Sequence, residues 1–249
     1  MSTGSPHLVL LTRVPVPGRV KTRLMGVLPG EQCAQLQRAF ALDAVERLAP
    51  LGLPLTVRYS EEAADNPTLL GEFLAEVEKA WELGGGNDGL RLEPQREDDL
   101  GARMASAIED ELARGAAECL LTGSDLPFLG AGLLAQALDA FGFEPAGAGF
   151  GPTETGSDPD VILGPTEDGG YWLVGLRQPF GELFAGKRYG SGGVFDDALA
   201  ACKAHGRSVV SGPATRDVDT PDDLRWLGRL VTAQDPRVGR RTAQVVRGL

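Results

Sequence analysis

Short apolar runs alternate along the chain with longer segments in which apolar residues recur every three or four positions. The short runs predict buried strands, and the recurring spacing predicts amphipathic helices. The predicted strands are 7–12, 53–59, 90–93, 118–122, 160–163, 171–176 and 207–210. The predicted helices are 31–48, 66–83, 98–114, 131–141 and 194–204, with a helical segment near 180–184 and a helix start at Thr220.

This alternation of strands and helices predicts an α/β fold with three layers, α/β/α, around a mostly parallel central sheet. In such sheets ligands bind outside the carboxyl ends of the strands. Polar motifs follow three of the predicted strands: residues 15–24 follow the first, Ser124 and Asp125 follow the fourth, and Asp217 and Asp219 follow the last. We therefore expect one site at this edge of the sheet.

The length of 249 residues fits one large α/β domain. We expect a single domain over residues 1–230 and a helical C-terminal tail over 231–249. Residues 143–159 are rich in glycine and proline and have no apolar period, which predicts a flexible insertion.

Charge and composition narrow the classes of function that the chain can have. The formal net charge is −11, which argues against non-specific binding to nucleic acid or to anionic membranes. No apolar run approaches the ~18 residues of a membrane span, and the N-terminus has no signal-peptide pattern. Three widely spaced cysteines fit a reducing compartment, so a cytoplasmic location is expected. With only two histidines, chemistry must rely on carboxylates, cations and backbone.

The loop PVPGRVKTRL, residues 15–24, places Arg19, Lys21 and Arg23 at alternate positions. In an extended backbone these side chains point the same way and would converge on one anion. Val20 replaces the glycine that a Walker A loop needs before its lysine. A basic surface loop stiffened by its two prolines is an equally good interpretation.

The aspartates after the strands are candidate metal ligands. Mg²⁺ takes oxygen ligands, usually one or two carboxylates together with substrate phosphates, so Asp125, Asp217 and Asp219 could hold a metal that bridges a diphosphate. The alternative is helix capping, with Thr220 as N-cap and Asp223 at the third helical position. Capping explains Asp223 and leaves Asp217 and Asp219 without a role.

Two further motifs allow a structural and a functional interpretation. Asp168-Gly169-Gly170 is a strong hairpin signal, but its glycines would also let an acceptor approach the backbone, with Tyr171 packing against it. Arg103, one turn into a predicted helix, is either a solvated side chain or a phosphate contact.

Together the motifs resemble a bacterial family of GT-A-like glycosyltransferases, or nucleotide-diphospho-sugar transferases. The matching segments occur in the family's order over most of the chain: PVPGRVKTRL, Gln95 with DLGARM, GSDLP, DVILGPTEDGGYWLVGL, ELF and DVDTPDDL. This family in turn looks related to phospholactate guanylyltransferase and to the molybdenum-cofactor nucleotidyltransferases. The resemblance implies a GT-A fold.

The resemblance also implies roles for individual residues. Donor phosphates would contact Gly18, Arg19, Lys21, Thr22 and Arg23. The nucleotide would contact Gln95, Gly101 and Arg103. A Mg²⁺ or Mn²⁺ ion would be held by Asp125, Asp217 and Asp219. The acceptor would contact Asp168, Gly169, Gly170 and Tyr171, and the catalytic residues would be Lys21, Asp125 and Asp168.

The function implied is a metal-dependent transferase with a nucleotide or nucleotide-sugar donor and a small-molecule acceptor, and sugar transfer is the first expectation. Nucleotidyl transfer with release of pyrophosphate needs the same parts, and a non-catalytic nucleotide-binding module is a third possibility. The chain departs from the family after ELF, where KRYGSGG stands in place of a Trp-Ser-Thr element, and at Arg13-Val14, where Lys-Ala is usual. The departure after ELF affects the identity of the acceptor.

Overall fold

The computed structural model describes residues 5–60, 66–142 and 159–249. The insertion predicted at 143–159 therefore lies, apart from its last residue, outside the described residues. Within the described segments, no helix is both long and apolar enough to cross a membrane.

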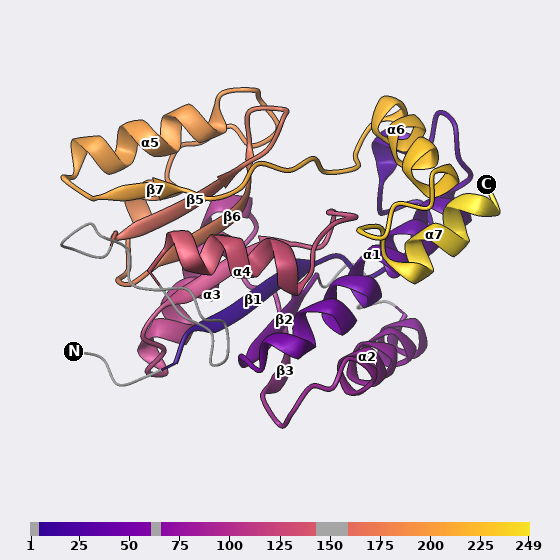
Figure 1. Cartoon of the computed structure of the whole chain (residues 1–249), viewed down its shortest axis with the longest axis horizontal. Helices are drawn as coiled ribbons and strands as arrows, with labels where there is room; N and C mark the ends of the chain where they lie inside the picture. Colours follow the sequence, from indigo (N-terminus) through magenta and orange to yellow (C-terminus); the bar gives the residue numbers. More distant parts are fainter. Residues whose placement is uncertain (1–4, 61–65, 143–158) are drawn as a thin grey trace.

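A seven-stranded sheet forms the centre of the fold (Figure 1). Its strands are β1 (His7–Thr12), β2 (Leu55–Tyr59), β3 (Leu90–Pro94), β4 (Cys119–Gly123), β5 (Val161–Pro165), β6 (Tyr171–Leu176) and β7 (Val209–Ser211). The order across the sheet is β3-β2-β1-β4-β6-β5-β7. Only β6 runs antiparallel to its neighbours, β4 and β5, among the described strands. The sheet is thus mostly parallel, as predicted.

Seven α-helices accompany the described strands. They are α1 (Gly30–Leu48), α2 (Pro67–Leu83), α3 (Leu100–Ala113), α4 (Ala131–Ala140), α5 (Val194–Ala204), α6 (Pro221–Thr232) and α7 (Arg240–Arg247). For α1 to α5 and for the start of α6, the boundaries lie within one or two residues of those predicted. The segment predicted near 180–184 forms a single 3₁₀ turn, η4 (Gly181–Leu183), because its run of apolar positions is too short for an α-helix.

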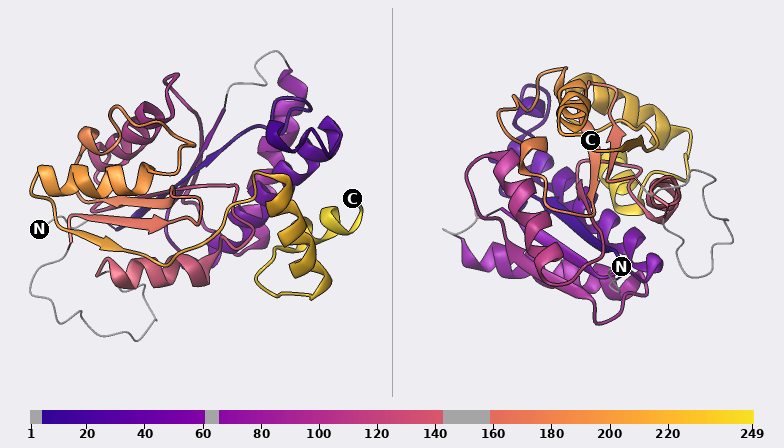
Figure 2. Two further views of the ribbon diagram at one scale, coloured as in Figure 1. Left: turned by 90° about the horizontal axis from the view of Figure 1, so that it is seen from above. Right: turned by 90° about the vertical axis from the view of Figure 1, so that its left-hand side faces the viewer.

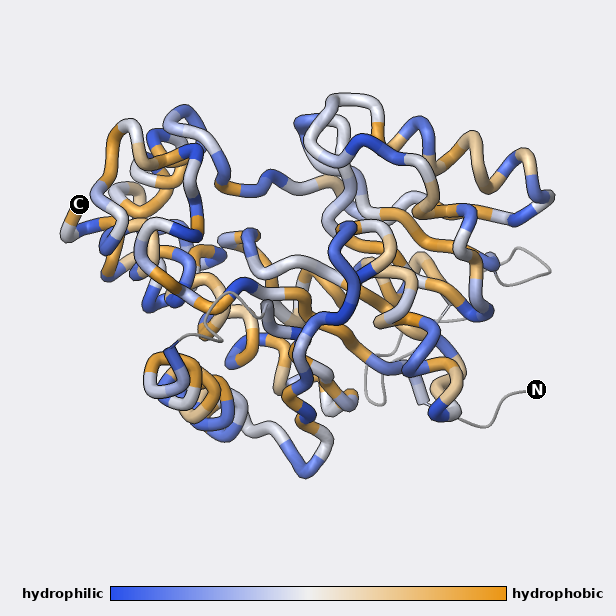
Figure 3. Tube along the Cα trace, turned by 180° about the vertical axis from the view of Figure 1, so that it is seen from behind, coloured by the Kyte–Doolittle hydropathy of each residue, from blue (hydrophilic) through white to orange (hydrophobic). Residues whose placement is uncertain are grey.

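The helices cover both faces of the sheet and make three layers, which confirms the predicted α/β/α fold. Seen from above, α3 and α5 lie on one side of the sheet and α4 on the other (Figure 2, left). One core joins α1, α2 and α4 to one face, and the second joins α3 and α5 to the opposite face. Hydrophobic segments accordingly run through the middle of the fold, and many connecting loops are hydrophilic (Figure 3).

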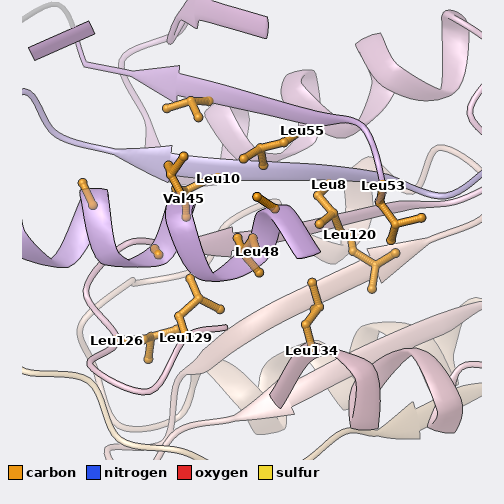
Figure 4. Close-up of a cluster of buried hydrophobic side chains, with 14 of the residues drawn as sticks. Leu8, Leu10, Val45, Leu48, Leu53, Leu55, Leu120, Leu126, Leu129 and Leu134 are labelled. Carbon is orange, nitrogen blue, oxygen red and sulfur yellow. The ribbon is translucent and has the colours of Figure 1, made fainter. Parts of the chain in front are cut away.

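The first core shows how alternate strand residues build the layers. Leu10 and Leu55 point from β1 and β2 toward Val45 and Leu48 of α1, and Leu134 of α4 joins them (Figure 4). All five are fully buried. Complete burial of a leucine contributes about 1.5–3 kcal/mol, so this cluster fixes α1 and α4 on the face of the sheet.

The C-terminal helices pack away from the sheet, against the outer side of α1 (Figure 1). Asp43 of α1 accepts hydrogen bonds from the backbone N–H groups of Arg241 and Thr242, at distances of 3.1 and 2.8 Å. These bonds satisfy the free amides at the start of α7. The division into a domain over 1–230 and a tail over 231–249 stays a prediction.

Two features of the sheet bring its polar connections to one edge. The carboxyl ends of the parallel strands share that edge, and the antiparallel β6 begins there. The turn between β5 and β6 therefore joins the loops after β1 and β4 on the same rim. The connection from β7 to α6 then crosses over this rim (Figure 1).

A buried polar cluster lies at the opposite end of β1. His7 Nε2 lies 2.9 Å from the hydroxyl of Thr56 and 3.5 Å from a carboxylate oxygen of Glu111. Glu111 is also paired with Arg91 and Arg114. Burial is the main cause that lowers the pKa of His7 from 6.5 to about 4, with Glu111 acting in the opposite direction. His7 is therefore neutral in the folded protein at pH 7.

This lowered pKa predicts a loss of stability in mild acid. The unfolded chain protonates His7 near pH 6.5 and the folded chain near pH 4, so the free energy of unfolding falls as pH drops through that window. We expect His7→Gln, which keeps a polar amide but cannot titrate, to remove on the order of 2–3 kcal/mol of this pH dependence. Urea unfolding of both proteins at pH 7, 5.5 and 4 measures it. If the free energy of unfolding changed equally with pH in wild type and in His7→Gln, the prediction would be contradicted.

Candidate functional site

A cavity of about 670 Å³ opens at the rim where the strands end. This volume is in the range of small-molecule sites. The cavity is lined by residues from the ends of β1, β3 and β4, from the start of α3, from the β5–β6 turn, and from the connections before α5 and α6.

The cavity brings together most of the residues predicted from the sequence, but not all. It is lined by Lys21, Thr22, Arg23, Gln95, Arg103, Asp125, Asp168, Gly170, Tyr171, Asp217 and Asp219. It is not lined by Gly18, Arg19, Gly101 and Gly169. The binding and catalytic roles of all these residues, inside and outside the cavity, stay predictions.

The loop after β1 is not extended, so the expected convergence of three alternate cations is wrong. Lys21 has a left-handed backbone conformation with φ of 49°, and a 3₁₀ turn, η1 (Thr22–Leu24), follows it. Val20, which precedes Lys21, and Leu24, the last residue of this turn, are both buried. The turn directs Lys21 and Arg23 to the cavity and leaves Arg19 outside it. Burial of Val20 and Leu24 thus overrides the alternating pattern of an extended chain.

Lys21 is the central cation of the cavity. Its side chain is only 2% exposed, and Nζ lies 2.9 Å from Asp125 Oδ1 and 3.4 Å from Asp219 Oδ1. Nζ also donates a hydrogen bond to the carbonyl oxygen of Val218 at 2.8 Å. Arg23, which is 59% exposed, contacts the other oxygen of Asp219 at 3.2 Å. A buried ammonium group therefore links the end of β4 to the connection before α6.

The positions of the acidic residues test whether the site suits a divalent metal ion. Within residues 5–60, 66–142 and 159–249, no three His, Cys, Asp or Glu side chains are grouped so as to hold a metal ion. Asp125 Oδ1 is buried and has no hydrogen bond besides its ion pair with Lys21, while the Asp125 side chain is 46% exposed. This donor set fits a metal shared with ligand phosphates, because Mg²⁺ commonly uses only one or two protein carboxylates. Of the three predicted ligands, Asp125 and Asp219 would hold it, and Asp217 does not complete a group of three with them.

Asp217 lies among like charges in the same cavity. Burial, followed by the charges of Asp168 and Asp219, raises the pKa of Asp217 to about 6, although Lys21 opposes this shift. The capping alternative is confirmed for the neighbouring residues only: Thr220 and Asp223 form a capping box at the start of α6. Asp217 and Asp219 remain available to the cavity.

The turn between β5 and β6 is the predicted hairpin, and it also reaches the cavity. Asp168 Oδ1 accepts hydrogen bonds from the Thr166 hydroxyl at 2.6 Å and from the Gly170 amide at 3.0 Å. Gly169 has φ of 85°, and a Cβ there would lie 2.2 Å from the carbonyl oxygen of Gly192. Gly169 therefore shapes the turn, while Asp168 and Gly170 face the cavity.

Gln95 and Arg103 act together at the end of β3. The Gln95 amide donates hydrogen bonds to the carbonyl oxygens of Thr12 and Arg58, both at 2.9 Å. Its oxygen accepts from Arg103 Nη1 at 3.4 Å. At Gly101, near the start of α3, a Cβ would approach the carbonyl oxygen of Phe184 to 2.8 Å and Tyr189 Cε2 to 3.1 Å. Gly101 permits close packing and does not touch the cavity.

Some residues of the cavity were missed by the sequence analysis. Gln37 of α1 is 2% exposed and donates to the hydroxyl of Ser124 at 3.0 Å, which in turn donates to the hydroxyl of Thr12 at 3.0 Å. The sequence did contain a signal for Gln37: it is a polar residue on the apolar stripe of its helix, one turn after Cys33. Tyr189, in the KRYGSGG segment, also lines the cavity, and its hydroxyl lies 3.2 Å from that of Tyr171.

The two halves of the sheet give the cavity two walls of different charge. After the roles predicted from the sequence, we call the lining residues up to Leu126 the donor wall and those from Thr166 onward the acceptor wall. The donor wall carries four cations, Arg13, Lys21, Arg23 and Arg103, and two acids, Asp98 and Asp125. Among its described residues the acceptor wall carries Asp168, Asp217 and Asp219 and no lysine or arginine.

This fold and rim site define the class: the chain has the nucleotide-diphospho-sugar transferase fold, which nucleotidyltransferases share. A crystal structure from Desulfovibrio desulfuricans G20, provisionally named a nucleotide-diphospho-sugar transferase, is 28% identical over 99% of this chain and 98% of that chain, with a TM-score of 0.77. Residues 70–191 match the family profile described as "Uncharacterized protein conserved in bacteria (DUF2064)". The predicted family resemblance is confirmed.

More distant structures share the fold alone. A cytidylyltransferase from Leptospira borgpetersenii serovar Hardjo-bovis is 13% identical over 98% of this chain and 93% of that chain, with a TM-score of 0.52. Rv0371C from Mycobacterium tuberculosis H37Rv, in complex with manganese, is 22% identical over 90% of this chain and 97% of that chain. Its TM-score of 0.43 is too low to locate a metal here. No curated protein matches the chain in sequence.

Proposed function

We propose that this protein is a metal-dependent glycosyltransferase that uses a nucleotide-diphospho-sugar as donor and a small molecule as acceptor. The observation that carries the proposal is the buried Lys21 ammonium, which lies between Asp125 and Asp219 at the rim of the cavity. A cation and two carboxylates at this edge are the parts needed to bind a diphosphate with a divalent metal.

The residues of the donor wall, together with Asp219 at its boundary, suit a diphosphate leaving group. Lys21 and Arg23 would contact its oxygens, and Asp125 and Asp219 would hold Mg²⁺ or Mn²⁺ beside it. When bound, the metal would supply neutralising charge for the departing nucleoside diphosphate. Gln95 and Arg103, at the end of β3, would contact the nucleotide.

A sugar nucleotide is favoured over a nucleoside triphosphate by two observations. The structure from D. desulfuricans, similar over the full length, carries the name of a nucleotide-diphospho-sugar transferase. Asp168 also lines the cavity, and its predicted role is to face the acceptor. A carboxylate there can accept the proton of an attacking hydroxyl group, whereas the phosphate group of a nucleotidyl acceptor is already deprotonated.

The identity of the leaving group tests the proposal. The protein would be incubated with Mg²⁺ or Mn²⁺ and a panel of nucleoside triphosphates and nucleotide sugars, first scoring thermal shift and then products. We expect a nucleotide sugar to stabilise the protein and to release a nucleoside diphosphate. Release of pyrophosphate from a triphosphate would overturn sugar transfer in favour of nucleotidyl transfer. A panel without any stabilising ligand would contradict both activities.

A further inference from the structure

The acceptor wall differs from the donor wall in what it can bind. Its polar side chains are Thr166, Asp168, Tyr171, Tyr189 and Asp217, with Asp219 at the boundary beside Lys21. Arg216, next in sequence to Asp217, does not line the cavity and is paired with Glu167 and Asp223 instead. The wall is therefore acidic and hydroxylic.

Two hydrogen bonds position the Asp168 carboxylate, and neither of them comes from a cationic group. Both of its hydrogen bonds come from uncharged donors, the Thr166 hydroxyl and the Gly170 amide, and both go to Oδ1. The side chain is exposed to the cavity. An ionised carboxylate only accepts hydrogen bonds, so a ligand that meets Asp168 must donate one.

Two tyrosines give the same wall an aromatic side. The rings of Tyr171 and Tyr189 meet edge to face, with centroids 6.4 Å apart and an interplanar angle of 86°. Their hydroxyl groups lie 3.2 Å apart. A tyrosine combines an apolar ring with a polar tip, so this pair can pack against the C–H groups of a ligand while contacting its hydroxyl groups.

We infer that the acceptor is an uncharged, hydroxyl-rich molecule, a carbohydrate or polyol, and not a phosphorylated one. Hydroxyl groups donate to the carboxylates of Asp168 and Asp217, and the C–H faces of the ligand pack on Tyr189. A phosphate group on the acceptor wall meets no lysine or arginine of that wall and is repelled by its carboxylates. The two cations beside the wall, Lys21 and Arg23, are already paired with Asp219. The inference rests on the proposed function, since it concerns the acceptor of that reaction.

Matched pairs of probes test this inference. Wild-type protein, with Mn²⁺ and the nucleotide sugar that stabilises it most, would be titrated with glucose and glucose 6-phosphate and with glycerol and glycerol 3-phosphate. Ligand-observed NMR measures binding whether or not transfer occurs, and release of nucleoside diphosphate measures turnover. We expect the neutral member of at least one pair to bind at least about tenfold more tightly than its phosphorylated partner.

Substitutions that each remove one charge test whether the preference for the neutral probe comes from the acceptor wall. Asp168→Asn keeps an oxygen that can accept from Gly170, and it should reduce the preference for the neutral probe at least about threefold. Asp98→Asn removes the same charge from the donor wall and should change the preference less than twofold. Tyr189→Ala should weaken both members of a pair and leave their ratio unchanged.

The outcomes separate this inference from the proposed function. Donor-loaded protein that prefers the phosphorylated probes, or that binds neither member of either pair, overturns the inference while the function stands. An unchanged ratio in Asp168→Asn also overturns it. Protein that binds no nucleotide sugar at all contradicts the proposed function itself.

Discussion

Replacing Lys21 by methionine is expected to lower kcat/KM for the donor about 10²–10³-fold, the usual loss when a group aimed at developing charge is removed. Lys21 is the cation that is buried against both Asp125 and Asp219. Without it, charge on the departing diphosphate would lose one of its two proposed cationic partners. Steady-state kinetics with the donor found in the ligand panel measures the effect.

The Lys21 variant should also change how the free protein binds metal. The ammonium group competes with a metal for the same carboxylate oxygens, so Lys21→Met should bind Mn²⁺ about tenfold more tightly when no donor is present. Arg23→Gln is the matched control, because it also removes one positive charge beside Asp219, from a largely exposed side chain. Equal effects of the two variants would show that Lys21 contributes only general charge.

Asp125→Asn is expected to abolish the dependence of donor binding on metal and to lower turnover about 10²–10³-fold. The substitution keeps the size of the side chain and removes the charge that would bind the metal. Asp125 is 46% exposed, so the fold should survive the change. Calorimetric titration of the donor with and without Mn²⁺, compared with wild type, measures the loss.

The control for Asp125 is Asp222→Asn. Asp222 is 74% exposed on the first turn of α6 and is paired with Arg225 one turn along. Its replacement should leave metal-dependent binding and turnover within about twofold of wild type, since isolated surface ion pairs contribute little. Turnover by Asp125→Asn at the wild-type rate would exclude this residue as a metal ligand.

The location of the site could be predicted from the sequence because strand ends are visible in it. Apolar runs that stop at Thr12, Thr122 and Val210 mark where polar residues must gather in a parallel sheet. The hairpin after β5 could be predicted from its Asp-Gly pair, and the start of α6 from its capping residues.

The conformation of the loop after β1 could not be predicted in this way. Alternation of charged residues implies an extended chain only where nothing else competes. Here Val20 and Leu24 are drawn into the interior, which forces Lys21 into a left-handed conformation and takes Arg19 away from the cavity. Such tertiary packing leaves no local signal in the sequence.

The hydrogen-bond partners of the buried Gln37 could not be predicted from the sequence either. Gln37, Ser124 and Thr12 are far apart in the chain, and only the neighbouring positions of β1, β4 and α1 bring them together. Tyr189 illustrates a different limit. It lies in the segment that departs from the family pattern, so the resemblance offered no role for it.

The division of the cavity between the two halves of the sheet has an evolutionary consequence. The donor wall comes from the chain up to Leu126, and the acceptor wall comes from Thr166 onward. Substitutions that alter one wall leave the backbone of the other in place, so under the proposed function acceptor selectivity would diverge among homologues while donor chemistry is retained. Under the same proposal, exchange of residues 187–193, which include the lining residues Tyr189 and Gly190, would be a route to new acceptors.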